Sequence, residues 1–367
     1  MSLPAADPDA RAHSAALQSL IAHEIAAAGG WISFARYMEL VLYAPGLGYY
    51  SAGAQKLGPD GDFTTAPEIS RLFGRTLARY FAETLSEHAP DILELGAGSG
   101  KLARDVLDEL DRLGRSPRRY WILEPSASLR ARQRELLAGH SPRVEWLDAL
   151  PSEFAGVIFG NEVLDALPVE LVHWYPDRTS RRGVELEHGA LKFAERLITE
   201  GALNDQADVI RGELGGYLER GDYRSEIGLA AQALTRSLAS ILKRGLLLWI
   251  DYGFERPAFY HPQRRDGTLM CHYRHHAHGD PFYLPGLQDI TAHVDFSAID
   301  AAARAGGLDA ALYTTQARFL LANGILELLA ETDANDAVRY LPLANQVSRL
   351  TSPAEMGELF KVIAWTR

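Results

Sequence analysis

The sequence has few of the features that mark secreted, membrane-bound or nucleic-acid-binding proteins. A single cysteine, Cys271, excludes an internal disulfide and a metal cage built from several cysteines. The longest strongly apolar run, Leu246 to Ile250, is far shorter than the roughly 20 residues that cross a bilayer. The formal net charge of -11 leaves no excess of basic side chains to neutralise phosphates. We therefore predict no membrane span, no nucleic-acid partner and no bound metal.

The amino-terminal residues lack an apolar signal core, and Asp7 and Asp9 make them too acidic for a transit peptide. These observations predict a cytoplasmic protein. Hydrophobic residues make up 47% and charged residues 23%, which is typical of a folded globular chain. The 367 residues allow one large decorated domain or two domains.

The first third of the chain predicts a helix followed by segments rich in turns. The first twenty or so residues, rich in Ala, Pro and Asp, are expected to be frayed. Leu17, Leu20, Ile21 and Ile25 then follow helical spacing, and Gly29-Gly30 ends the helix. Glycine and proline punctuate the segments 43–50 and 61–68, which indicates turns. These segments either cover a pocket or pack beneath the helices beside them.

From residue 91 onward, short apolar runs alternate with helical stretches. This alternation is typical of βαβ units, and it predicts a mostly parallel sheet with helices on both faces. The predicted strands are 92–95, 120–123, 144–147, 157–159, 246–250, 308–313 and 360–365. The predicted helices are 102–113, 129–137, 227–242, 298–305 and 319–330.

The spacing of these elements predicts three parts. Residues 1–85 form an amino-terminal helical and loop extension that covers the site. Residues 86–175 and 240–367 form the Rossmann-like core. Residues 176–239 form an insertion, with a hairpin at its front and helices behind.

A glycine-rich turn, Glu94-Leu-Gly-Ala-Gly-Ser-Gly100, follows the first predicted strand and opens a helix. Gly96, Gly98 and Gly100 allow the backbone to approach a ligand closely and to adopt positive φ. The pattern also contains Gly98, Gly100 and Ala103 at the spacing of a dinucleotide site, so by itself it leaves two nucleotide cofactors open.

Three acids at successive strand ends favour S-adenosylmethionine over a dinucleotide. Glu94, two residues before the first glycine, is placed to receive an ammonium group and would repel a pyrophosphate. Glu124 can accept hydrogen bonds from both hydroxyls of a ribose, and Asp148 can receive an adenine amino group. Acids solvated at strand ends would explain any one of these positions, but they explain the set less well.

A second acidic cluster, Asn161, Glu162 and Asp165, follows the fourth predicted strand. Methyl transfer from a sulfonium is an in-line displacement in which the enzyme mainly positions the nucleophile. Two carboxylates can hold a guanidinium bidentately and take up the proton that is released. The alternative is that Asp165 caps a helix and Glu162 is a surface residue.

The ordered motifs resemble those of the MidA-like methyltransferases, the family that contains the mitochondrial complex I assembly factor acting as a protein arginine methyltransferase. The resemblance extends from about Ile32 to the end of the chain. Its motifs are Gly61-Asp-Phe-Thr-Thr-Ala-Pro-Glu68, the glycine turn, Asn161-Glu-Val-Leu-Asp-Ala-Leu-Pro-Val169, Asp251-Tyr-Gly253, Thr291-Ala-His-Val-Asp-Phe296, and Thr315-Gln316 with Phe319-Leu320.

The resemblance implies a seven-stranded class I fold with a helical insertion, S-adenosyl-L-methionine as the methyl donor, and an arginine acceptor on a protein such as a complex I subunit. It places Thr64, Thr65 and Pro67 beside the cofactor and Glu162 and Asp165 against the acceptor. It also places His293 and Asp295 in the cleft. Ala97, Ser99 and Val163-Leu164 depart from the family pattern and flank the expected acceptor pocket. A homodimer is also compatible with the sequence.

The histidine-rich run 271–278 has two interpretations. Its ligands would be crowded into one loop with Arg274 among them, which disfavours a metal site, so we expect a loop that shapes the acceptor cleft. Three other functions stay open for the chain: methylation of a small molecule, a cofactor-binding assembly factor without turnover, and an oxidoreductase.

Overall fold

The computed structural model describes residues 3–52 and 65–367, which form two compact units. Unit 1 comprises Met1–Ala54, Leu164–Ala233 and Phe254–Ile299, and unit 2 comprises Gln55–Val163, Leu234–Gly253 and Asp300–Arg367. This division differs from the one expected from the sequence, because residues 254–299 belong with the insertion and the amino-terminal segment rather than with the core.

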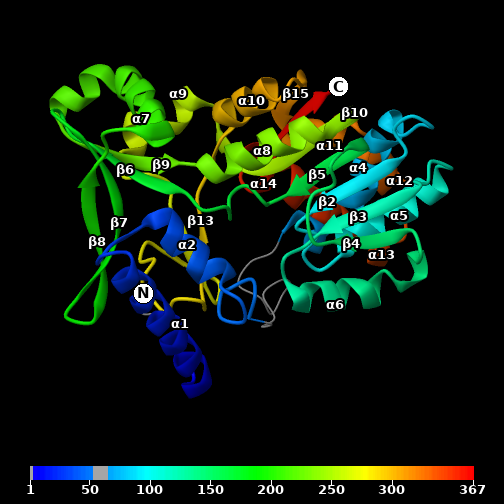
Figure 1. Ribbon diagram of the computed structural model, residues 1–367. Coiled ribbons are helices and arrows are strands. Elements are labelled where there is room, and N and C mark those ends of the chain that lie inside the picture. Colours follow the sequence, from blue (N-terminus) through cyan, green and yellow to red (C-terminus); the bar gives the residue numbers. More distant parts are fainter. Residues whose placement is uncertain (1–2, 53–64) are drawn as a thin grey trace. The chain divides into compact units, whose positions relative to one another are not determined.

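Unit 2 is built on a twisted sheet (Figure 1) whose strands follow the order β15-β16-β10-β5-β2-β3-β4. Neighbouring strands from β10 to β4 are parallel, whereas β16 is antiparallel to both β10 and β15. The order in which strands are added along the chain reverses between β2 and β5, which makes this the switch point where open α/β sheets bind ligands. The strands are β2 (Asp91–Leu95), β3 (Arg119–Leu123), β4 (Val144–Leu147), β5 (Phe154–Asn161), β10 (Leu242–Phe254), β15 (Asp309–Thr315) and β16 (Phe360–Thr366).

Helices cover the sheet of unit 2 because its strands are apolar on both faces. One face packs against α4, α5 and α11–α13, in a core that includes Phe81, Val106, Phe159 and Leu350. Among the bonds on the sheet, Trp365 Nε1 donates to Asp300 Oδ1 at 2.8 Å. The helices are α3 (Ala66–Ile69), α4 (Arg71–Thr84), α5 (Lys101–Arg112), α6 (Ala127–Leu136), α8 (Leu229–Ile241), α10 (Phe296–Ala305), α11 (Gln316–Ala322), α12 (Ile325–Ala330), α13 (Ala337–Thr351) and α14 (Met356–Leu359). The predicted α/β class with a mostly parallel sheet is confirmed.

Unit 1 combines two antiparallel sheets with helices. In the first sheet the strands follow β1-β7-β6-β9, with β8 pairing to β7, and the second has the order β12-β11-β13. The hairpin predicted at the front of residues 176–239 is present as β7 and β8, which pair antiparallel. The strands of these sheets are β1 (Ile32–Ser33), β6 (Glu170–Trp174), β7 (Thr179–Glu187), β8 (Ala190–Leu197), β9 (Tyr223–Ile227), β11 (Met270–Tyr273), β12 (His276–His278) and β13 (Asp289–Thr291), and the short strand β14 (Val294–Asp295) belongs to neither. The helices are α1 (Pro8–Ala27), α2 (Phe34–Tyr43), α7 (Gly201–Leu214) and α9 (Arg256–Phe259).

Three local predictions were wrong. The amino terminus is helical from Pro8, because Asp7 accepts a hydrogen bond from the Ala10 N–H and proline suits the first helical turn. The stretch 319–330 is two helices, interrupted where Gly324 adopts φ 85°. The histidine run is the β11–β12 hairpin, whose turn residues Arg274 and His275 both have positive φ.

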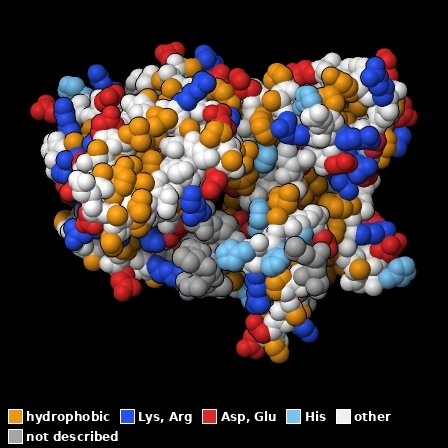
Figure 2. Space-filling model, turned by 180° about the vertical axis from the view of Figure 1, so that it is seen from behind, with side chains coloured by type: hydrophobic (Ala, Val, Ile, Leu, Met, Phe, Trp, Pro, Cys, Tyr) orange, Lys and Arg blue, Asp and Glu red, His pale blue; other side chains and the backbone are white. Residues whose placement is uncertain are grey.

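No helix in the described ranges is both long enough and apolar enough to span a bilayer. On the face that Figure 2 shows, basic and acidic side chains are interspersed over much of the surface. This mixture agrees with a chain whose 48 acidic residues exceed its 37 basic ones without a block of one sign.

Candidate cofactor and acceptor site

The glycine turn joins β2 to α5 and adopts a backbone that only glycine takes without strain. Gly96, Gly98 and Gly100 have φ values of 64°, 53° and 84°. A Cβ atom at Gly96 would lie 3.1 Å from Val163 Cγ2, and one at Gly100 would lie 3.2 Å from Gln133 Cγ. All three glycines therefore serve the conformation of the turn, and Gly96 and Gly100 also allow close packing.

Glu94 lies inside the unit at the second-last position of β2. Its side chain is almost fully buried, and Tyr120 Oη donates to Glu94 Oε2 at 2.8 Å. Burial raises the pKa of Glu94 to about 8, and the hydrogen bond from Tyr120 opposes this increase. A cation bound beside this carboxyl group would lower its pKa and favour the ionised form. The predicted role of Glu94, binding an ammonium group, can therefore be tested through the pH dependence of binding.

Glu124 follows β3 and is also buried. Its Oε1 accepts from the Ser126 N–H at 3.0 Å and its Oε2 from Gln133 Nε2 at 3.3 Å. Burial raises the pKa of Glu124, and these donors and the Gly98 N–H lower it. Sequence patterns did not single out Gln133, because a glutamine in a helix carries no motif of its own.

Asp148 follows β4 and is mostly exposed. Arg130 Nη1 lies 2.5 Å from Asp148 Oδ1, and the same guanidinium donates to the Leu147 and Glu124 carbonyl oxygens. Arg130 thus ties the ends of β3 and β4 together. The expected contact between Asp148 and an adenine amino group stays a prediction.

Within the motif at 61–68, Glu68 contacts the glycine turn, although the sequence did not predict it as a site residue. Thr64 lies outside the described residues. Thr65 precedes α3 and Pro67 lies in its first turn, both half-buried. Glu68 accepts from Ser99 Oγ at 2.5 Å and pairs with Lys101 Nζ at 2.5 Å, with 5% of its side chain exposed. Its position at the end of a recognised motif was the available signal.

Asn161 and Glu162 lie at the carboxyl end of β5, beside the switch point. Glu162 has φ 54°, a left-handed conformation that is costly for a residue with a Cβ atom. Its N–H donates to the Ile250 carbonyl at 2.9 Å, and Asn161 Nδ2 donates to Glu162 Oε1 at 3.0 Å. Asn161 Oδ1 is buried and has no hydrogen-bond partner among the described residues. A buried hydrogen-bond acceptor without a partner, next to a residue with a strained backbone, is typical of a binding site.

Asp251 of the Asp-Tyr-Gly motif holds this strained segment in place. Its Oδ2 accepts from the Val163 N–H at 3.1 Å and its Oδ1 from the Tyr252 N–H at 2.9 Å, and its side chain is buried. Sequence reasoning quoted Asp251 as part of a motif without assigning it a role. We expect it to position Glu162 through the backbone.

Asp165 belongs to unit 1, where it is buried near two tyrosines of the segment 43–50. Tyr43 Oη donates to the Ala166 carbonyl at 2.9 Å, and Tyr50 Oη donates to Asp289 Oδ1 at 2.9 Å. Burial raises the pKa of Tyr50 well above its usual value, and the carboxyl groups of Asp289 and Asp165 add to the effect. The segment 43–50 therefore contacts the chain around Asp165, and Asp289 is an acid that sequence reasoning missed.

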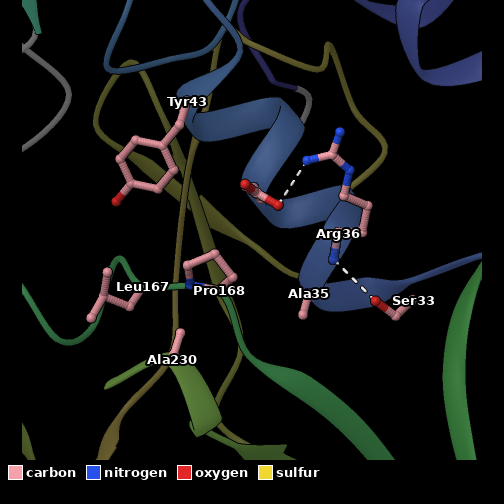
Figure 3. A pocket seen from close by; sticks show the side chains of 8 residues that line it. Ser33, Ala35, Arg36, Tyr43, Leu167, Pro168 and Ala230 are labelled. Carbon is pink, nitrogen blue, oxygen red and sulfur yellow. Dashed lines mark hydrogen bonds and ion pairs between the residues drawn. The ribbon is translucent and has the colours of Figure 1, made fainter. Parts of the chain in front are cut away.

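A hollow of about 620 Å³ opens in unit 1 beside the residues that follow Asp165. Figure 3 shows Tyr43, Leu167, Pro168 and Ala230 on one side of it and Arg36 on α2, where Nη1 bonds to Glu39 Oε2 at 2.8 Å. Its wall also contains Ser33 and Ala35. Most of its lining side chains are apolar, and Arg36 and Glu39 add an ion pair.

His293 and Asp295 lie in unit 1, and the structure gives each a local environment. Burial lowers the pKa of His293 to about 4, and its ring lies 5.3 Å from that of Phe254. Asp295 Oδ1 accepts from the Ser297 and Ala298 N–H groups at 3.0 and 3.1 Å, and Oδ2 lies 3.3 Å from Arg256 Nε. Asp295 therefore caps the amino terminus of α10. His293 is neutral at pH 7, which suits an uncharged contact or a base.

Within the described residues, no group of three or more His, Cys, Asp or Glu side chains is placed to hold a metal ion. Cys271 is buried in β11, and burial raises its pKa to about 12. Its thiol is therefore un-ionised at neutral pH.

The residues of unit 2 fit S-adenosylmethionine. The positive-φ glycines admit a ligand close to the backbone, Glu124 lies just after β3 where the sequence predicts the ribose contact, and Asn161 Oδ1 offers an unused acceptor. The carboxyl ends of the strands bring these groups to one edge of the sheet.

Comparisons with known proteins agree with this arrangement. A family described as S-adenosyl-L-methionine-dependent methyltransferases matches residues 76–314, more than half of the chain. A crystal structure of a Burkholderia thailandensis protein bound to S-adenosyl-homocysteine is 51% identical, with a TM-score of 0.93, and the match covers 100% of this chain and 95% of that one.

More distant relatives have named activities. The Rattus norvegicus protein arginine methyltransferase NDUFAF7 is 28% identical over 91% of this chain and 81% of its own length. Its Caenorhabditis elegans homologue is 28% identical over 73% of this chain and 67% of its own length. Taken with the glycine turn and the strand-end acids, the match over residues 76–314 shows that the chain belongs to this family of S-adenosyl-L-methionine-dependent methyltransferases.

Proposed function

We propose that this methyltransferase modifies an arginine of a protein, with Glu162 as the carboxylate that holds the acceptor. The observation that carries the proposal is the left-handed backbone of Glu162 at the end of β5, fixed by Ile250 and, through Val163, by Asp251. Strain of this kind persists where the surroundings fix it, and it often accompanies function. The rat and nematode relatives named as protein arginine methyltransferases support the choice of acceptor.

The bound cofactor supplies a methyl group on a positively charged sulfur. In our proposal, the two carboxylate oxygens of Glu162 accept hydrogen bonds from two guanidinium nitrogens of the arginine. These bonds fix the plane of the guanidinium and leave one nitrogen directed at the methyl carbon. The new nitrogen–carbon bond forms as the carbon–sulfur bond breaks, and its electron pair stays on sulfur. The proton that the nitrogen loses passes to Glu162.

Asn161 would orient Glu162 in this scheme, since its Nδ2 donates to one lone pair of Glu162 Oε1 and leaves the second lone pair of Oε1 and both of Oε2 for the acceptor. A contact between Asp165 and the acceptor stays a prediction from the sequence.

As the acceptor protein we propose a subunit of respiratory complex I, as the family resemblance implies. A cytoplasmic site of action and a homodimer stay predictions from the sequence. Cell fractionation tests the first, and light scattering of the purified chain tests the second.

The test is a mass-spectrometric search for methylated arginine on candidate complex I subunits incubated with the enzyme and S-adenosylmethionine. Glu162→Gln is expected to abolish the signal while S-adenosylhomocysteine binding is retained. Glu153→Gln serves as the matched control, because Glu153 is an exposed acid of the same unit that pairs only loosely with Lys243. If the enzyme methylates only small molecules, the proposed protein acceptor is wrong. If it binds the cofactor but methylates no acceptor, the chain is an assembly factor without turnover.

A further inference from the structure

Gln133 is the sole buried residue of helix α6, and it is polar. A helix that packs on a sheet normally turns apolar side chains inward. Burying an amide is unfavourable unless its hydrogen bonds are made. This side chain is fully buried, so its contacts explain why a glutamine is placed there.

The amide of Gln133 joins three parts of the cofactor site. Its Nε2 donates to the Gly98 carbonyl oxygen at 2.8 Å and to Glu124 Oε2 at 3.3 Å, and its Oε1 accepts from Trp146 Nε1 at 2.8 Å. An indole N–H only donates, and a carboxylate and a carbonyl accept, so the chemistry of the partners fixes which end of the amide faces which group.

These contacts close a ring of hydrogen bonds around Gly98. The Gly98 N–H interacts with the Glu124 carboxylate, Glu124 accepts from Gln133, and Gln133 donates back to the Gly98 carbonyl. Gly98 has a left-handed backbone, so both of its peptide groups are restrained at the conformation that brings the turn close to a ligand.

We propose that Gln133 is a positioning residue for S-adenosylmethionine, which sets the direction of the Glu124 carboxylate and the backbone of Gly98 together. Glu124 accepts from the Ser126 N–H on Oε1 and from Gln133 Nε2 on Oε2 and also interacts with the Gly98 N–H, and its remaining lone pairs would accept from ribose hydroxyls. Gln133 acts through these two groups and needs no contact with the cofactor. The inference concerns cofactor binding, so it does not depend on arginine being the acceptor.

The experiment measures S-adenosylhomocysteine binding to the full chain by calorimetry. Gln133→Met keeps the volume and removes all three hydrogen bonds. We expect affinity to fall by about tenfold to a hundredfold, the range for losing bonds to a charged group and a carbonyl. Binding within about twofold of the parent protein, with the variant folded, would overturn the proposal. No binding by the parent protein would instead contradict its assigned cofactor.

Gln316→Met is the matched control. Gln316 is also fully buried in unit 2, and its Nε2 donates to the Leu350 carbonyl at 2.9 Å. This variant should lose thermal stability and keep its affinity for S-adenosylhomocysteine. A general loosening of the fold would lower affinity in both variants, and that result would also overturn the positioning role.

A double-mutant cycle with Glu124→Gln separates positioning from stability. If Gln133 acts through Glu124, the two losses of affinity are smaller together than their sum, whereas independent roles give additive losses. Should Gln133→Met not fold, Gln133→Asn replaces it, because it keeps the amide but is too short to reach Gly98, Glu124 and Trp146 together. An unchanged affinity in Gln133→Asn would count against the proposal.

Discussion

Replacing Glu162 by glycine and by alanine separates its backbone from its side chain. A left-handed conformation costs a residue with a Cβ atom about 1–2 kcal/mol, and glycine avoids that cost. Glycine loses about 0.5–1 kcal/mol more than alanine in backbone entropy on folding. Both variants lose the carboxylate and the hydrogen bond from Asn161 Nδ2, so these losses cancel in the comparison. With φ at 54°, Glu162→Gly should be more stable than Glu162→Ala by up to about 1.5 kcal/mol.

The assay is urea unfolding of both variants without cofactor, alongside methyl transfer. Neither variant should be active. Asp108 in α5 provides the control pair, because at an exposed helical position glycine should be less stable than alanine by about 1 kcal/mol. If Glu162→Ala equals or exceeds Glu162→Gly in stability, the backbone at this position is unstrained and the argument for a held acceptor carboxylate loses its basis.

Three further predictions concern the buried titratable groups and the turn. Burial raises the pKa of Glu94 to about 8 from 4.5, so between these values the folded protein holds a proton that the unfolded chain has lost and the free energy of unfolding falls as pH rises. Glu94→Gln should flatten that slope in urea titrations, and an unchanged slope would contradict the assignment. If Glu94 receives the cofactor ammonium, S-adenosylhomocysteine binding near pH 7 should also release a proton, visible by calorimetry in buffers of different ionisation enthalpy. Burial lowers the pKa of His293 to about 4 from 6.5, so stability present above the unfolded pKa is lost as pH falls through this interval, and His293→Phe should reduce the loss in acid-unfolding curves. A variant that loses stability as steeply as the parent would refute this role for His293. Gly98→Val places a branched side chain at φ 53° and should abolish S-adenosylhomocysteine binding while the chain stays folded by circular dichroism; retained affinity would mean that the turn does not approach the ligand.

Much of the sheet was predictable because its strands are local apolar runs. The predicted strand 144–147 coincides with β4, and the predicted strands 92–95 and 120–123 differ from β2 and β3 by one residue at their start. The predicted strand 157–159 is longer in the structure, since Gly156 and Gly160 hide its apolar pattern. Hydrophobic periodicity reports burial, and it cannot report the pairing that lets small residues continue a strand.

The sequence by itself also determined the glycine turn, the acids at the strand ends and the class of cofactor. Glycines and carboxylates act through short-range geometry, so their spacing along the chain is sufficient to recognise them. Only the tertiary structure decided that Glu68 and Gln133 hold that turn, since their partners lie about 30 residues away and a single polar side chain carries no period. The structure likewise assigned residues 254–299 to unit 1, because burial against partners distant in the chain, and not local pattern, determines which segments pack together.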